Sequence, residues 1–278
     1  TGRRVPPAAL PLSVGVVVNN VQTLINVARA VENEEPVIEK TLTINGMVKK
    51  PITVTVPIGT TYRQVLEMAG GATVDNPAYL NGGPMMGVYF TDLDEPIKKT
   101  TGALLVLPHD HLLIRRRTQD MTSVVAMART VCEQCCLCTE LCPRHLIGHE
   151  LPPHLIVRAV NYRKADQTES STILSALTCS ECGICEAYAC PVDISPMRLN
   201  QALKAEFRAE GAKYVGELRP LNPMTEYRLL PINRLITRID LDKMNHKAPL
   251  EDIVFEPRQV TLPLLQHIGA PAKPIVSV

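Results

Sequence analysis

Two short rows of cysteines decide what this chain folds around: CEQCCLCTELCP at Cys132–Pro143 and CSECGICEAYACP at Cys179–Pro191. In each row three cysteines stand three positions apart, and a fourth cysteine directly before a proline closes the row. Three thiolates at this spacing can wrap one cubane, because the loop between them curls with its backbone N–H groups toward the sulfur atoms. The rows therefore predict two iron–sulfur clusters, of the [4Fe–4S] type, and electron transfer as the chemistry.

The fourth cysteine of each row is predicted to serve the cluster of the other row. The first row has the C-x2-C-x2-C-x3-C-P spacing of bacterial two-cluster ferredoxins, in which the fourth cysteine ligates the other cluster. The proline after it turns the chain away from its own loop. This logic assigns Cys132, Cys135, Cys138 and Cys190 to cluster 1, and Cys179, Cys182, Cys185 and Cys142 to cluster 2.

Other uses of these cysteines are disfavoured by their number and spacing. Zinc also binds Cys-x2-Cys pairs, but one zinc site needs two such pairs and no third cysteine or Cys-Pro in each row. A secreted disulfide framework would tie distant loops together in a short chain, whereas all nine cysteines lie within residues 132–190. We predict that the ninth, Cys136, is a small buried residue beside a cluster, with a redox or alternate-ligand role as the alternative. For His145, His149 and His154 we predict capping or hydrogen bonding between the halves.

Composition narrows the function further. Lys and Arg together number 29 and Asp and Glu 28, so the net charge of +1 points neither to nucleic acid nor to an anionic membrane. No apolar run approaches the roughly 18 to 20 residues that a membrane-spanning helix needs. Basic residues precede an apolar stretch at the N-terminus, but prolines interrupt it, so no signal peptide is expected. The tight cysteine spacing favours a reducing compartment.

Residues 39–108 carry the pattern of a small α+β unit. TLTINGMVKKPITVTVP at 41–57 alternates β-branched and polar residues around turn signals, which predicts two strands. A helix over 61–71 should end at a glycine pair, followed by a glycine-rich loop, NGGPMMG at 81–87, and a final strand, GALLVLP at 102–108. Strands around one helix suggest a β-grasp-like domain. The fold class is therefore an α+β multidomain chain, with the β-grasp domain before the ferredoxin-type domain.

The remaining segments connect or flank these two domains. Residues 109–130 are predicted to contain a linker and a short helix, MTSVVAMARTV at 121–131. The linker ends in an arginine triplet, which is predicted to be a solvated surface turn, with docking of an acidic redox partner as the alternative. The ferredoxin-type domain is predicted over 131–210 and ends in an amphipathic helix at 195–211. At the start, Val14–Val18 has the composition of a strand, and a helix capped by Asn19 or Asn20 follows it. Both ends of the chain are expected to cut through domains.

The cysteine rows, read with their flanks, resemble a known family. CEQCCLCTELCPRHLIGHELPPH and CSECGICEAYACPVDISP are similar to the cobalamin reductases of propanediol-utilisation microcompartments, the PduS family, which is related to RnfC subunits of NADH:ferredoxin oxidoreductases. The resemblance implies that residues 1–38 end an FMN-binding flavoprotein domain and that residues 39–108 form an SLBB β-grasp domain. It also implies that residues 211–278, ending in LPLLQHIGAPAKPIVSV, are an extended segment and the start of a barrel-sandwich domain.

The same resemblance implies a function for the full-length protein. NADH would be oxidised by FMN, electrons would pass through two [4Fe–4S] clusters, and the cobalt of cobalamin would be reduced. Asn19 and Asn20 match asparagines near FMN in related flavoproteins, although Gln22 stands where that motif has glutamate. The glycine-rich segment that cradles FMN and NADH is missing from this sequence, so flavin binding by this chain alone is expected to be poor.

The resemblance also implies a setting for the protein. It is expected in the cytoplasm, inside a bacterial microcompartment, with a corrinoid substrate and a shell or adenosyltransferase partner. The alternatives are an RnfC-type subunit of an NADH:ferredoxin oxidoreductase complex and a non-enzymatic redox adaptor. The order of domains favours the cobalamin reductases, because the barrel-sandwich segment follows the cysteine rows here and precedes the flavin domain in RnfC.

Overall fold

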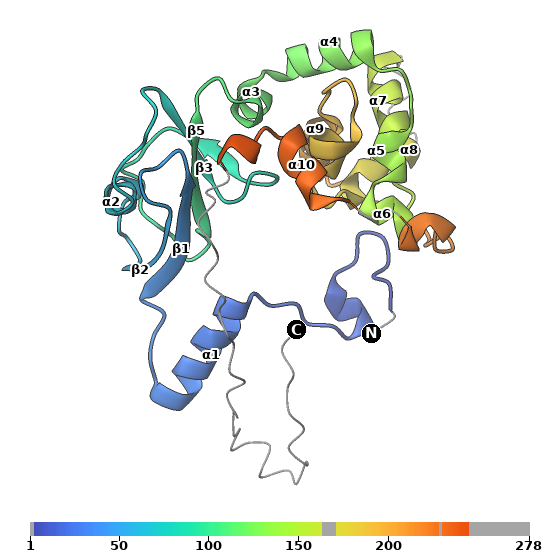
Figure 1. Cartoon of the computed structure of the whole chain (residues 1–278). Coiled ribbons are helices and arrows are strands. Elements are labelled where there is room, and N and C mark those ends of the chain that lie inside the picture. The colour runs from blue at the N-terminus through green and yellow to red at the C-terminus, as the bar shows by residue number, and fades with distance from the viewer. Residues whose placement is uncertain (1–2, 163–170, 228–229, 245–278) are drawn as a thin grey trace. The chain divides into compact units, whose positions relative to one another are not determined.

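The computed structural model describes residues 3–162, 171–227 and 230–244 (Figure 1). The expected start of a barrel-sandwich domain at 262–278 lies outside these residues. Within the described ranges no helix combines the length and the apolar character needed to cross a membrane.

The first domain is built on a five-stranded sheet of order β2-β1-β5-β3-β4. Its strands are β1 (Glu39–Gly46), β2 (Ile52–Pro57), β3 (Pro77–Asn81), β4 (Val88–Phe90) and β5 (Ala103–Pro108). β1 and β2 form an antiparallel hairpin, and the central pair β1–β5 is parallel. Leu42 and Ile44 point into the core, while threonines cover the other face in hydrogen-bonded pairs such as Thr41–Thr55 at 2.8 Å. The predicted alternation is confirmed.

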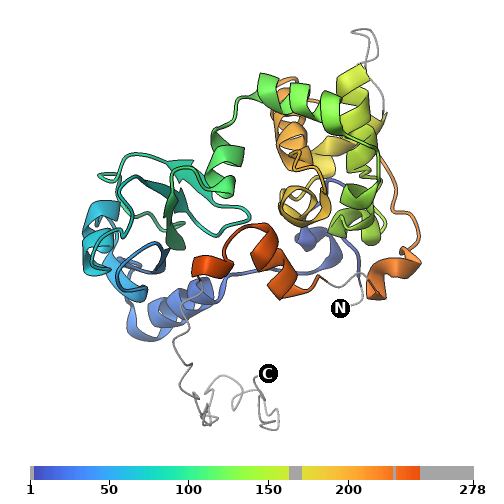
Figure 2. The same cartoon turned by 45° about the horizontal axis from the view of Figure 1, so that its top comes forward.

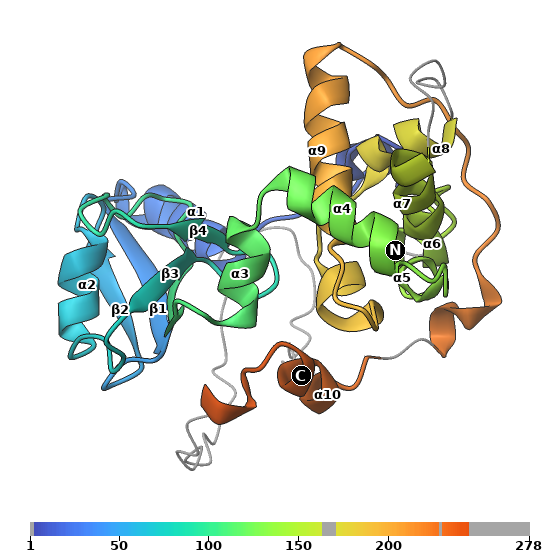
Figure 3. The same cartoon turned by 90° about the horizontal axis from the view of Figure 1, so that it is seen from above.

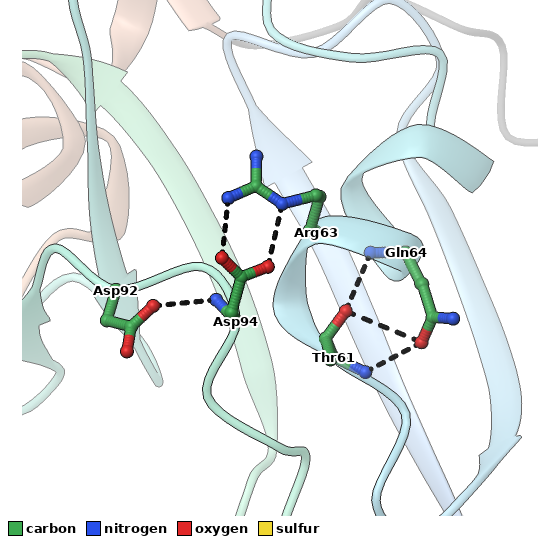
Figure 4. Close-up of polar contacts among 5 residues, drawn as sticks. All are labelled: Thr61, Arg63, Gln64, Asp92 and Asp94. Carbon is green, nitrogen blue, oxygen red and sulfur yellow. Dashed lines mark hydrogen bonds and ion pairs between the residues drawn. The ribbon is translucent and has the colours of Figure 1, made fainter.

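Helix α2 (Tyr62–Met68) covers one face of this sheet (Figure 2). A capping box begins it: the Thr61 hydroxyl accepts from the Gln64 backbone N–H, and the Gln64 side chain accepts from the Thr61 N–H (Figure 4). Gly70 and Gly71, with φ of 80° and 82°, end it as predicted. Tyr62, Val65 and Leu66 then close the core over β1 and β5.

The strand predicted at Val14–Val18 is absent. Residues Pro11–Val14 form a short 3-10 helix, η1, and the chain then runs without pairing to helix α1 (Val21–Asn33). Val17 and Val18 are each 73% exposed. Valine favours strands only where a neighbouring strand can pair and pack with it, and the described residues offer none here. The predicted helix and its Asn20 cap are confirmed.

The arginine triplet does not lie in an irregular, solvated linker. It belongs to helix α3 (Leu112–Thr118), which begins where the His111 side chain accepts from the Leu113 N–H. Only Arg115 of the three is fully exposed, and Arg116 is 4% exposed. The helix buries its apolar residues against the sheet, and this packing takes Arg116 and Arg117 inward with it.

Helices surround the cysteine rows in the second domain. They are α4 (Met121–Val131), α5 (Leu137–Glu140), α6 (Pro143–Leu146), α7 (Pro153–Tyr162), α8 (Ser171–Leu174), the 3-10 helix η2 (Ser175–Thr178), the π-helix η3 (Cys185–Ala189) and α9 (Pro196–Ala209). α4, α7 and α9 pack on one another around Val124, Val157 and Leu199 (Figure 3). The helices predicted at 121–131 and 195–211 are confirmed.

A shared core joins the sheet to the second cysteine row. It contains Ala78, Leu80 and Leu107 of the sheet, Leu113 and Ile114 of α3, Ala187 of η3, and Ile239. Ile239 directly follows helix α10 (Ile232–Arg238), whose Arg238 donates to the Cys190 carbonyl at 2.6 Å. Two further 3-10 helices, η4 (Pro223–Glu226) and η5 (Asp242–Met244), complete the described elements. The first domain therefore packs directly on a cysteine-bearing helix.

Candidate metal centres

The two cysteine rows follow the same backbone course. Counting from the first cysteine of each row, the third and fifth residues have positive φ: 54° at Gln134 and 65° at Cys136, then 58° at Glu181 and 78° at Gly183. Alternation of left-handed and ordinary conformations turns successive N–H groups toward one point, which forms an anion-binding nest. The Glu181 N–H donates to the Cys179 sulfur, with 3.4 Å between nitrogen and sulfur. Both loops are thus shaped to surround a negatively charged group.

Each row opens on its own cavity. One cavity is lined by Cys190 and by the first row's Cys132, Cys135 and Cys138, with the adjacent Cys136. The other is lined by the second row's Cys179, Cys182 and Cys185 together with Cys142. The first row's fourth cysteine therefore lies in the second row's cavity, and the reverse also holds. This is the crossed grouping that the spacing predicts, while iron ligation by these thiols stays a prediction.

The chemistry of the cavity walls fits a four-iron cluster. Four predicted ligand cysteines line each space, and Cys136 lines the first as a fifth cysteine. The rest of the second cavity is largely apolar, with Leu151, Pro153 and Met197 among its walls. In the described part of the chain, no three His, Cys, Asp or Glu side chains converge on the position of one metal ion. A cubane instead takes one thiolate at each of four separate iron corners. The four predicted ligands around each cavity match those four corners in number.

Several of the cavity thiols have raised pKa values, which favour the neutral form. Burial raises the pKa of Cys138 to about 12 and that of Cys142 to about 11. Burial, with the nearby Glu186 carboxyl, also raises the pKa of Cys185 far above its ordinary value. The neighbours that raise the pKa of Cys138 further are the other three thiols of its own cavity. Metal binding must therefore release protons.

These raised pKa values predict that the cluster-free fold loses stability in alkali. An unfolded thiol ionises near its ordinary pKa of 9.0, whereas folded Cys138 and Cys142 stay protonated up to about 12 and about 11. Their contribution to stability is therefore complete below the unfolded value and is lost as the pH rises toward the folded values. Thermal unfolding under reductant and chelator should show a midpoint that falls above about pH 9. A midpoint that rises there would contradict the burial of neutral thiols.

Cys136 stands where the second row has Gly183. Its thiol donates to the Gln134 carbonyl at 3.2 Å, and the residue is half-buried beside the first cavity. A Cβ atom at Gly183 would lie only 2.9 Å from the Met85 carbonyl oxygen, so that position needs glycine. Cys136 adopts the corresponding left-handed conformation, with φ of 65°, although it carries a side chain.

Replacing Cys136 with glycine is expected to preserve both metal centres. Glycine adopts φ of 65° without steric cost, so the free energy of unfolding should stay unchanged or rise by about 1 kcal/mol. Iron content and urea unfolding check both points. Loss of half the iron would instead identify Cys136 as a ligand.

The three histidines have different surroundings. His154 lines the first cavity, and its Nδ1 shares a hydrogen bond of 2.6 Å with the buried Thr139 hydroxyl, which links α7 to α5. His149 is 1% exposed, and neither of its ring nitrogens has a hydrogen-bond partner. Burial lowers the pKa of both residues, so the rings favour the neutral form. Helices α5 and α7 both belong to the first-row side of the domain, so hydrogen bonding between the halves stays a prediction.

Arg117 holds the glycine-rich loop against the second row, a role that the sequence does not reveal. Its guanidinium donates to the carbonyls of Gly87 at 2.7 Å, Pro84 at 2.8 Å and Met85 at 2.9 Å. The Met85 carbonyl in turn faces Gly183, between two cysteines of the second cavity. Met85 is partly buried in the shared core, whereas Met86 is 62% exposed.

Buried charges lie beside the same cysteines. Glu186 follows Cys185 and is 3% exposed, and burial raises the pKa of its carboxyl while Arg117 and Arg116 oppose that rise. Arg116 donates to Asp193 at 2.7 Å, and its backbone carbonyl accepts from Arg198 at 2.6 Å. Helix α3 thus places two arginines, Arg116 and Arg117, beside the second row.

The residues expected near a flavin lie at the start of α1. Asn20 caps the helix, and its Oδ1 accepts from the Gln22 N–H at 2.9 Å. The Gln22 side chain accepts from Lys40 at 2.6 Å and donates to the Thr41 carbonyl at 3.0 Å, which ties α1 to β1. Asn19 is exposed. Flavin contacts of Asn19 and Asn20 stay a prediction.

Comparison with family models identifies both domains. Residues 41–89 match the SLBB domain, and residues 131–195 match the 4Fe-4S dicluster domain. The predicted fold class is confirmed: an SLBB domain is followed by a ferredoxin-type domain. The cysteine rows and both cavities fall within the second match.

The resemblance to cobalamin reductases is confirmed by whole-chain comparison. The chain is 60% identical over 276 residues to cobalamin reductase PduS of Citrobacter freundii and 60% identical over 278 residues to that of Salmonella typhimurium. It spans 61% of the length of each, while 99% and 100% of this chain are covered. A more distant relative belongs to the proton-translocating ferredoxin:NAD(+) oxidoreductase complex of Clostridium ljungdahlii. That protein is 35% identical over 147 residues, which cover 52% of this chain and 30% of the relative.

Proposed function

We propose that this chain relays electrons through two [4Fe–4S] clusters as part of an NADH- and FMN-dependent cob(II)alamin reductase. The observation that carries the proposal is the pair of cavities, each lined by the three evenly spaced cysteines of one row and the Cys-Pro cysteine of the other. Cys132, Cys135, Cys138 and Cys190 would hold one cluster, and Cys179, Cys182, Cys185 and Cys142 the other. When bound, each cluster supplies a one-electron carrier whose potential depends on hydrogen bonds, charge and solvent.

The protein's own contribution is to hold, bury and polarise these sites. The nests formed around Gln134, Cys136, Glu181 and Gly183 direct N–H groups toward the thiols. The crossed cysteines, Cys142 and Cys190, connect the two loops, so that the metal centres form as one unit. Apolar walls exclude water from the second cavity, and Arg117 keeps the SLBB loop over its edge.

The full-length activity is proposed from the names of the relatives. Two proteins 60% identical to this chain are called cobalamin reductases. We extend to this chain their substrate class, a corrinoid, with NADH and FMN as the electron source and Asn19 and Asn20 beside the flavin. A microcompartment setting, with a shell protein or an adenosyltransferase as partner, completes the proposal. An RnfC-type role is the second candidate, favoured by the 35% identity to the Clostridium ljungdahlii protein.

The cluster proposal is tested by anaerobic reconstitution with iron and sulfide. We expect about eight iron atoms and eight sulfides per chain, and an EPR spectrum of the reduced protein with spin coupling between two cubanes. A single cluster, or stoichiometric zinc with a colourless protein, contradicts the proposal.

The activity proposal needs the full-length protein. We expect NADH-dependent reduction of cob(II)alamin, and its loss when Cys138 or Cys185 is replaced. Oxidation of NADH through flavin with no corrinoid turnover would favour the second candidate instead.

A further inference from the structure

Asn200 is a buried amide without a hydrogen-bond partner at the edge of the second cavity. The residue is 1% exposed, and neither its Nδ2 nor its Oδ1 makes a hydrogen bond of ordinary geometry. Leaving both halves of a buried amide unpaired costs free energy, because each loses water without replacement. Retention of asparagine at such a position points to a partner that occupies the cavity.

The amide lies in a cavity where cysteine sulfurs are the main side-chain acceptors. The second cavity is lined by four cysteines, and its other walls are apolar or backbone, apart from the exposed Ser180 and Asn200 itself. Asn200 and Cys179 line the same cavity, and the Asn200 amide has no hydrogen-bond partner there. Among the four thiols, Cys179 is the one whose backbone is tied to the helix that carries Asn200, because Lys204 donates to the Cys179 carbonyl at 2.7 Å. Its sulfur is therefore the acceptor that the amide can serve once it carries negative charge.

Helix α9 fixes the amide in this position. One turn further along the same face, Lys204 is 9% exposed and donates to the Cys179 carbonyl at 2.7 Å and to Glu181 at 2.6 Å. Residues four apart lie above one another on a helix. Lys204 thus anchors the loop around Cys179 to α9 and keeps Asn200 facing the thiol.

The first cavity has a donor of its own. There the Gln134 amide donates to the Cys132 sulfur at 3.3 Å, and its Nε2 also contacts the His154 carbonyl at 3.2 Å. Gln134 belongs to the cysteine loop, whereas Asn200 comes from a separate helix. Each cavity therefore has one amide next to the first cysteine of its row.

We propose that Asn200 is a positioning residue that donates an N–H···S hydrogen bond to the Cys179 thiolate and raises the reduction potential of the second-row cluster. The inference rests on the proposed two-cluster function. A donor near a sulfur stabilises the more negative, reduced state more than the oxidised state, so its removal lowers the potential. Gln134 has the same effect on the first-row cluster.

The test is a redox titration followed by EPR on the reconstituted protein. Asn200→Leu, which keeps the volume and removes the amide, should lower the midpoint potential of one cluster and leave the other unchanged. Gln134→Met should lower the potential of the cluster that Asn200→Leu leaves alone. Ala205→Asn, which adds an amide on the exposed side of α9, is the control and should change neither potential.

The outcomes separate this inference from the proposed function. If the unaltered protein does not assemble two clusters, the proposed function fails. If Asn200→Leu assembles two clusters and each has the same potential as in the unaltered protein, the inference is overturned while the proposed function stands. If Asn200→Leu assembles only one cluster, pulsed EPR of the unaltered protein labelled with ¹⁵N-asparagine decides. A nitrogen coupling to one reduced cluster supports the hydrogen bond, and its absence overturns it.

Discussion

Replacing Cys190 with alanine is expected to remove the cluster of the first row, and replacing Cys142 that of the second. Cys190 is 5% exposed and lies in the cavity of Cys132, Cys135 and Cys138. It belongs to the second row in sequence but to the first row's cavity in space. A cubane that lacks one of four thiolates loses affinity and opens an iron to solvent. Iron content after anaerobic reconstitution should fall from about eight to about four atoms per chain in each variant.

Double variants show which cluster is lost. Because Cys132 and Cys190 line the same cavity, replacing both should cost no more iron than replacing Cys190 alone. Replacing Cys190 together with Cys179 should remove nearly all iron, because the two residues line different cavities. Cys136→Ala is the matched control and keeps both clusters. The crossed assignment is wrong if the Cys190/Cys179 pair retains four iron atoms while the Cys190/Cys132 pair retains none.

The cysteine loops could be predicted because their geometry is local. Spacing alone limits which thiols can reach one cubane, and the proline after Cys142 and after Cys190 sends each fourth cysteine elsewhere. The β1–β2 hairpin and α2 could also be predicted from the sequence, because alternation, a capping residue and a glycine pair each act within a few residues. The crossed cavities follow from joining two such local loops.

Other features depend on contacts that no short pattern encodes. Strands β3 and β4 are only five and three residues long, too short for alternation to indicate them. A run of three arginines ordinarily marks a solvated surface, and α3 has only seven residues in which a helical period could appear. The unpaired amide of Asn200 is visible only when its burial is known. Tertiary packing decides all three.

Replacing Arg117 with alanine is expected to lower the free energy of unfolding by about 2–4 kcal/mol, because several charge-assisted hydrogen bonds are lost together. Its guanidinium joins three carbonyls of the loop at 82–87 and also contacts the Leu113 carbonyl at 3.1 Å. Burial lowers the pKa of Arg117, as expected for a cation removed from water. Urea unfolding of the cluster-free protein measures the loss.

Arg115 supplies the control on the same helix. It is exposed, so Arg115→Ala should change the unfolding free energy by no more than about 0.5 kcal/mol. Arg117→Lys should recover only part of the stability, because an ammonium is a point charge that cannot reproduce the planar fork facing three carbonyls. Equal effects of Arg115→Ala and Arg117→Ala would contradict the anchoring role.

Arg117→Ala should increase hydrogen exchange in the loop at 82–87 more than in the rest of the fold. Without Arg117, the carbonyls of Pro84, Met85 and Gly87 lose their common donor, and the Met85 carbonyl is free to leave Gly183. Hydrogen exchange over residues 82–87 should therefore accelerate in Arg117→Ala, while exchange in β1 keeps its rate relative to global unfolding. Faster exchange across the second cysteine row as well would show that this SLBB loop also stabilises the metal-binding loop beneath it. Unchanged exchange over 82–87 would mean that the shared core alone holds the loop in place.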